Sequence, residues 1–146
     1  MTDSTNKPNT PFWIIGIVAL IWNLMGAFAY INQVTMTEEA LVALPEAERA
    51  MYENVPAWAT AAFAIAVFAG VLGCILLLLR KKLATTVLLI SLAAILVQMF
   101  YNFFIYLGKA TEVYGPGSII MPVMVIIIGF FLVWHTRKSN VKGWLS

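Results

Sequence analysis

Hydrophobic residues fill four long stretches of this chain, and polar or charged residues are largely confined to the segments between them. A helix needs about 20 apolar residues to cross the hydrocarbon core of a bilayer. The four stretches therefore predict membrane-spanning helices over about residues 12–33, 57–79, 83–107 and 118–135. We predict an all-α fold, an integral membrane four-helix up-down bundle that forms a single transmembrane domain over residues 1–146.

The longest polar segment, residues 37–55, separates the first two predicted spans and is rich in glutamate. Thr37 can cap a helix whose first turn is acidic, which the positive end of the helix dipole favours. Pro45 interrupts that helix and can open a second one. We predict a short extracytoplasmic helical cap here, and a short loop at Gly108–Gly117.

The composition of the chain predicts that it resides in a lipid bilayer. The chain is 62% hydrophobic and 11% charged, with a mean hydropathy of +0.88. Soluble domains are roughly half apolar and about a quarter charged. Lipid is therefore the first expected partner, and nothing in the net charge of +2 indicates binding to nucleic acid.

Basic residues set the expected orientation. They gather at one side of the predicted membrane: Lys7, Arg80, Lys81, Lys82, Arg137, Lys138 and Lys142. Short loops rich in lysine and arginine stay in the cytoplasm. We therefore expect a multi-pass protein with cytoplasmic N- and C-termini. The triplet Ala27-Phe28-Ala29 matches a signal cleavage pattern, but the apolar run is longer than a signal core, so we expect a retained span.

Uncharged polar residues lie inside the predicted spans. An amide in hydrocarbon must find a hydrogen-bonding partner, at a cost of several kcal/mol if it fails. We predict a neutral pocket between the first and third spans that opens outward. Its candidate ligand-binding residues are Asn23, Tyr30, Gln98, Tyr101 and Asn102, with Gln33 near the mouth. The alternative is that these amides bond to each other and to backbone carbonyls, holding the helices together.

Small residues line one face of the second span, at Ala62, Ala66, Gly70 and Gly73. Such a seam lets helices approach closely in lipid, where no hydrophobic force drives them together. The fourth span offers only Gly129 as an obvious close-contact point, so we expect it to be the most lipid-exposed.

Several absences narrow the function. No Asp, Glu, Lys or Arg lies inside the predicted spans, which disfavours a proton-driven carrier of the small multidrug type. The single histidine, His135, and the single cysteine, Cys74, supply no haem pair, metal site or disulfide within the chain. Catalytic motifs are also missing. We therefore predict no enzyme activity, no cofactor and no metal.

Five stretches carry a resemblance to known sequences: Phe12-Trp13-Ile14-Ile15-Gly16, Trp22-Asn23-Leu24-Met25-Gly26, Pro45-Glu46-Ala47-Glu48-Arg49, Pro56-Ala57-Trp58-Ala59 and Lys142-Gly143-Trp144-Leu145-Ser146. They look like an uncharacterised group of small four-span bacterial inner-membrane proteins that are often labelled sugar transporters. The resemblance implies the inner (plasma) membrane of a bacterium, and it carries over no binding or catalytic residue.

Two functions remain open at this point. The first is a carrier or transport-associated protein for neutral polar, sugar-like solutes. The alternative is an accessory or scaffold membrane subunit that packs against a larger membrane partner through the small-residue seam and the acidic cap. Four helices leave little room for a solute path, so we also expect a homo-oligomer or a larger assembly.

Overall fold

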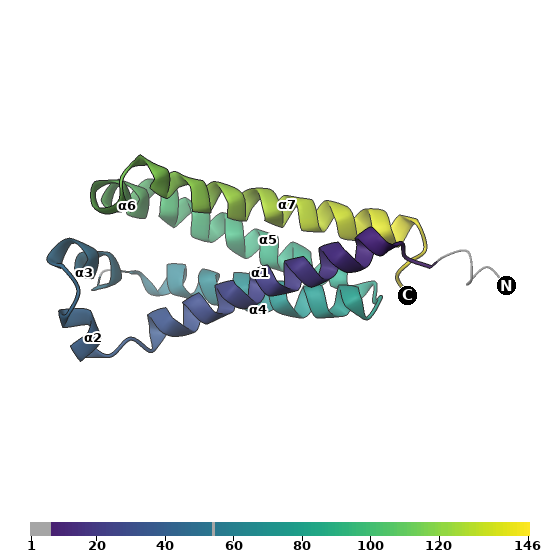
Figure 1. Cartoon of the computed structure of the whole chain (residues 1–146), viewed down its shortest axis with the longest axis horizontal. Helices are drawn as coiled ribbons and strands as arrows, with labels where there is room; N and C mark the ends of the chain where they lie inside the picture. Colours follow the sequence, from purple (N-terminus) through teal and green to yellow (C-terminus); the bar gives the residue numbers. More distant parts are fainter. Residues whose placement is uncertain (1–6, 54) are drawn as a thin grey trace.

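A computed structural model describes residues 7–53 and 55–146, without the side chains of residues 105–107. Every regular element in this part of the chain is a helix. Four long helices form the bundle: α1 (Thr10–Val34), α4 (Ala57–Leu78), α5 (Leu83–Tyr101) and α7 (Ile120–Val141) (Figure 1). The four candidate spans that contain them are long and apolar enough to cross a membrane, which indicates a multi-pass membrane protein. The predicted all-α bundle is confirmed.

Two short helices lie between α1 and α4, within the segment predicted as a cap. They are α2 (Glu38–Val42) and α3 (Glu46–Glu53). The Thr37 hydroxyl accepts a hydrogen bond of 3.1 Å from the backbone N–H of Ala40, so it caps α2 as expected. Residue 54 of the predicted segment lies outside the described residues.

The segment after α5 corrects one prediction. Asn102–Tyr106 form a π-helix and α6 (Leu107–Tyr114) follows it, where the sequence predicted a loop at Gly108–Gly117. A 3-10 turn, Pro116–Ile119, then leads into α7.

Packing explains why α6 is helical. It lies against α3, and its residue Ala110 is buried. These contacts with the cap stabilise α6, and they cannot be predicted from the local sequence. The helix ends at Gly115, whose φ of +88° is open to glycine at little cost.

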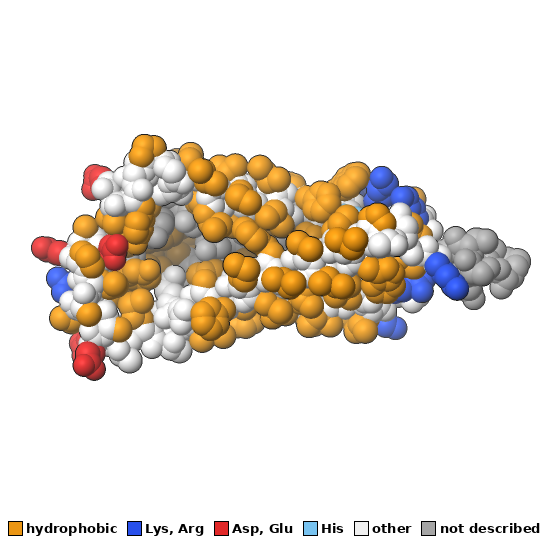
Figure 2. Space-filling view, in the orientation of Figure 1, with side chains coloured by type: hydrophobic (Ala, Val, Ile, Leu, Met, Phe, Trp, Pro, Cys, Tyr) orange, Lys and Arg blue, Asp and Glu red, His pale blue; other side chains and the backbone are white. Residues whose placement is uncertain are grey.

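The order of the long helices places α4 and α5 in the middle. α4 packs against α1 on one side and α5 on the other, and α5 packs against α7. The first turn of α1 and the last turn of α7 lie at one end of the bundle, and α2, α3 and α6 lie at the other (Figure 1). Most lysine and arginine side chains gather at the first end, and acidic side chains at the second (Figure 2). We call these the basic end and the acidic end.

α7 continues beyond the predicted span end at residue 135 and reaches Val141. The hydroxyl of Thr136 donates to the carbonyl of Leu132 at 2.7 Å, and that of Ser139 donates to the carbonyl of His135 at 2.9 Å. Both residues are buried, so these bonds satisfy hydroxyl groups that water does not reach.

The residues after α7 fold back onto the basic end. Leu145 is buried in a cluster with Phe12, Leu77 and Ala84. The Arg80 side chain donates a hydrogen bond of 2.8 Å to the carbonyl of Trp144, which fixes this segment against the turn between α4 and α5. The basic end is thus closed by packed side chains.

Candidate functional site

Two adjoining cavities lie inside the bundle. The first, which we call the inner cavity, has a volume of about 380 Å³ and is lined by α1, α4, α5 and α7. The second, the outer cavity, has about 410 Å³ and lies beneath α3 and α6 at the acidic end. Five residues line both of them: Phe63, Gln98, Asn102, Met121 and Pro122. The two cavities therefore form one cleft that runs from the bundle interior toward the cap.

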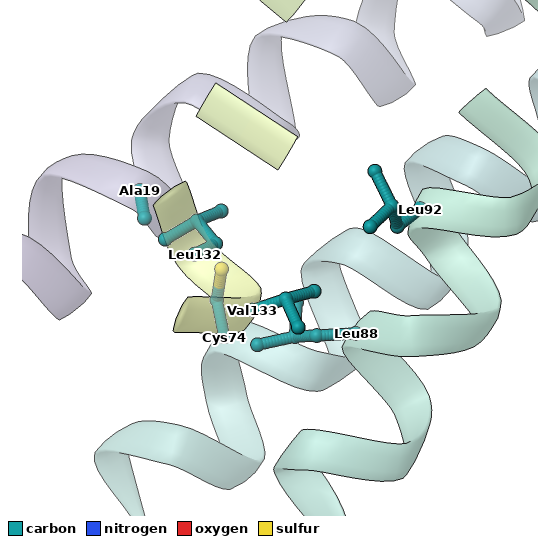
Figure 3. Close-up of a cluster of buried hydrophobic side chains, with 6 residues drawn as sticks. All are labelled: Ala19, Cys74, Leu88, Leu92, Leu132 and Val133. Carbon is teal, nitrogen blue, oxygen red and sulfur yellow. The ribbon is translucent and has the colours of Figure 1, made fainter. Parts of the chain in front are cut away.

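A buried hydrophobic cluster closes the inner cavity toward the basic end. Side chains from all four long helices meet there: Ala19, Cys74, Leu88, Leu92, Leu132 and Val133 (Figure 3). Leu88, Leu92 and Leu132 also line the inner cavity. The cluster is thus the floor of the cleft.

Gln98 stands at the junction of the two cavities. Its side chain makes no hydrogen bond with any residue that the structure describes, whereas its backbone carbonyl accepts one of 3.0 Å from the Asn102 amide. An amide left without partners in a membrane interior loses several kcal/mol. The Gln98 amide is therefore available to whatever occupies the cleft.

Asn102 lies one turn further along, where α5 gives way to the π-helix. Its Nδ2 donates one of its two N–H groups to the Gln98 carbonyl, so the second N–H and the Oδ1 remain for an occupant. Single π turns inside α-helices frequently occur at functional sites, because they redirect side chains. Here the irregularity begins at a residue that faces both cavities.

Asn23 lines the inner cavity but is used mainly for packing. Its Nδ2 donates to the Ala19 carbonyl at 2.8 Å and lies 3.5 Å from the Cys74 sulfur in α4. Its Oδ1 lies against Gly70. Asn23 thus joins α1 to α4, and it does not bond to Gln98 or Asn102.

The other predicted residues separate into two groups. Tyr101 and Gln33 line the outer cavity, and the Tyr101 ring packs edge-on against Trp58 with ring centroids 5.8 Å apart. Tyr30 lines neither cavity, because its ring packs edge-on against Phe63 and a second phenylalanine of α4 at 5.4 and 5.6 Å. The structure therefore does not place Tyr30 in the predicted pocket.

The location of the cleft also differs from the prediction. α1 packs on α4 and has no comparable contact with α5, so the first and third spans do not form a cleft by themselves. The inner cavity is lined by four helices, including α7, which the spacing of the amides did not predict. Pro122, Val125 and Gly129 line it at spacings of three and four, a pattern that would have marked this face.

The small-residue seam is buried inside the chain. Ala62, Ala66, Gly70 and Gly73 are all buried. A Cβ atom at Gly73 would come within 2.6 Å of the Leu88 side chain of α5. The hydroxyl of Ser91 donates a hydrogen bond of 2.6 Å to the carbonyl of Ala66. The seam thus packs α4 against its own neighbours, and a partner protein would have to use another surface.

The lining of both cavities is uncharged. Among the described residues, neither cavity is lined by Asp, Glu, Lys, Arg or His. No group of three or more His, Cys, Asp or Glu side chains in this part of the chain is placed to hold a metal ion. At the rim of the outer cavity, burial and then the Glu48 carboxylate raise the pKa of the Tyr114 hydroxyl.

Comparison with known proteins gives no match. No protein-family model matches the chain, and neither a curated protein nor a solved structure does. The resemblance to small bacterial inner-membrane proteins therefore stays a prediction, and the function has to be argued from the cleft itself.

Proposed function

We propose that this protein is a small carrier or transport-associated protein for uncharged, hydrogen-bonding solutes, which it holds in the cleft at Gln98 and Asn102. One observation carries the proposal. The Gln98 amide lies at the junction of two cavities and has no hydrogen-bonding partner among the described residues. An uncharged hydroxyl group in the cleft would satisfy both its donor and its acceptor.

The size and lining of the cleft support a ligand site. Small-molecule sites usually occupy about 300–1,000 Å³, with mainly apolar walls and a few well-placed polar groups. Each cavity falls within that range, and the polar groups converge where the two meet. A charged ligand would find no opposite charge in the lining, and burying an unpaired ion is costly.

The segregation of charge supports an orientation for this activity. Lysine and arginine gather at the basic end, and short basic segments stay in the cytoplasm. We therefore place both termini in the cytoplasm and the cap on the opposite side, which makes the outer cavity the extracytoplasmic part of the cleft. A bacterial inner membrane is the setting that the sequence resemblance implies.

Flux through reconstituted vesicles tests the proposal. We expect wild-type protein to accelerate the equilibration of a radiolabelled polyol, and the double variant Gln98→Ala plus Asn102→Ala to lose most of that acceleration. Asn32→Ala is the matched control, because Asn32 is an exposed amide of α1 that lines neither cavity. Equal flux through wild type and the double variant would remove the cleft from the proposed function.

A further inference from the structure

The cleft has a mouth in the side of the bundle. α1 and α7 meet near the basic end, where the rings of Phe12 and His135 lie 5.9 Å apart, but they make no extensive contact along their length. Met25 of α1 and Met121 of α7 both line the inner cavity, yet 63% and 59% of their surfaces are exposed. The inner cavity therefore reaches the flank of the molecule, and Figure 2 shows that flank hollowed toward the acidic end.

The mouth lies within the helices that span the membrane, so the medium outside it is hydrocarbon. α1 and α7 are both candidate spans, and little of either is buried inside the bundle. A molecule that enters between them comes from the bilayer. A water-soluble sugar that took this lateral route would first have to give up its hydration, which costs several kcal/mol for each polar group left without a partner.

The walls of the inner cavity favour a hydrocarbon chain. Branched apolar side chains of α5 and α7 form much of its wall and floor: Leu88, Leu92, Ile95, Val125, Ile128 and Leu132. Of the amides that line it, Asn23 is engaged with the Ala19 carbonyl and the Cys74 sulfur, whereas Gln98 and Asn102 at the junction keep amide groups for an occupant. The cleft is thus apolar at the inner end and uncharged but polar in the middle.

We propose that the occupant of the cleft is an uncharged membrane lipid with a hydroxyl-bearing head. Its acyl chain enters between α1 and α7 and lies in the inner cavity, and its head binds the amides of Gln98 and Asn102. This inference rests on the proposed function and names its substrate class. An anionic lipid fits less well, because the lining offers no cation to pair with its head.

Tryptophan quenching by brominated lipids tests this directly. Trp22 lines the inner cavity, so a brominated acyl chain bound there should quench its fluorescence. The full chain is placed in phosphatidylcholine nanodiscs and titrated with brominated diacylglycerol. As a control, brominated phosphatidylcholine at the same mole fraction measures the quenching caused by non-specific contact with lipid. We expect diacylglycerol to quench more strongly, and the excess to disappear in Trp22→Phe but persist in Trp58→Phe, whose tryptophan lines neither cavity.

A second variant tests the head-group contact. Gln98→Leu keeps the size of the side chain and removes its hydrogen bonds. We expect the mole fraction of diacylglycerol that gives half-maximal quenching to rise roughly three- to tenfold, because one hydrogen bond in the membrane interior is lost. Asn32→Leu should leave it unchanged.

Two results would overturn the lipid assignment: equal quenching by the two brominated lipids in wild type, or an excess that Gln98→Leu does not weaken. The flux assay separates this failure from failure of the proposed function. If polyol flux still depends on Gln98 and Asn102, only the lipid assignment is wrong. If flux is independent of both residues as well, the proposed function fails with it.

Discussion

The side-chain oxygen of Asn23 occupies the space that a Cβ atom would take at Gly70. Because α1 and α4 meet at this contact, the absence of a side chain at position 70 lets the amide of one helix lie directly on the backbone of the next. The Ser91 hydroxyl of α5 lies close to the same point. Three helices therefore converge on one glycine at the edge of the inner cavity.

Gly70→Ala should destabilise the bundle by about 1–3 kcal/mol, as overpacking of a tight interior does. Denaturant unfolding in detergent, followed by circular dichroism, measures the change. Adding Asn23→Ala to Gly70→Ala should recover part of the loss, because the colliding amide is gone. Gly108→Ala is the control, since a Cβ atom there meets nothing within 4 Å. Equal stability of Gly70→Ala and Gly108→Ala would contradict the packing described for this site.

Ser91→Ala should cost about 1 kcal/mol, the typical value of a hydrogen bond between membrane helices. The buried Ser91 hydroxyl donates to the Ala66 carbonyl, so its loss leaves a weaker contact between α5 and α4. The same unfolding measurement applies. Thr86→Ala on the exposed face of α5 should have little effect, and a comparable loss there would show that the hydrogen bond to α4 is not the cause.

Leu145→Ala should destabilise the protein by roughly 2–5 kcal/mol, because Leu145 is buried against Phe12, Leu77 and Ala84. Thermal unfolding in detergent compares it with Val141→Ala, which removes an apolar side chain that is 87% exposed. We expect Leu145→Ala to melt at a much lower temperature than Val141→Ala. Similar melting temperatures would mean that the segment after α7 is not held against the basic end.

The contact between α6 and the cap should depend on pH. The pKa of Tyr114 is raised above its ordinary value of 10.0, first by burial and then by the Glu48 carboxylate. A raised pKa favours the neutral hydroxyl in the folded state. The contribution of Tyr114 to stability is therefore complete below pH 10.0 and is lost as the pH rises through the folded pKa.

Tyrosinate absorbance, taken as the difference between wild type and Tyr114→Phe, follows this titration. We expect Glu48→Gln to lower the pKa of Tyr114 toward its ordinary value, while Glu39→Gln in α2 leaves it unchanged. A midpoint that does not move in Glu48→Gln would exclude the carboxylate as a cause.

The sequence predicted the four long helices well because an uncharged apolar run of sufficient length has few alternatives in a membrane protein. It predicted their ends less well. Thr136 and Ser139 are polar but buried, and α7 continues through them to Val141, so the end of the apolar run is not the end of the helix. The π-helix at Asn102–Tyr106 has no sequence signature, because it depends on how the backbone bonds shift.

The candidate site was predicted in outline from the amides alone. Gln98 and Asn102 share a helix face by spacing, and the structure places both at the junction of the cavities. Spacing could not decide which helix α1 packs against. Because α1 lies on α4, Tyr30 contacts Phe63 and Asn23 contacts Gly70. The Tyr30 and Asn23 side chains therefore serve in helix packing. The order of helices around a bundle depends on tertiary contacts that one sequence does not reveal.

The most direct test of the cleft compares two neighbouring positions at the same depth of α5. Gln98 faces the cavities, and Val97 is exposed on the outside of the bundle, where lipid lies. Cys74 is fully buried, so the wild-type chain serves as the unreactive control. In vesicles treated with a charged, membrane-impermeant thiol reagent, Gln98→Cys should react several-fold faster than Val97→Cys. Equal rates, or no reaction at position 98, would contradict an accessible cleft at Gln98.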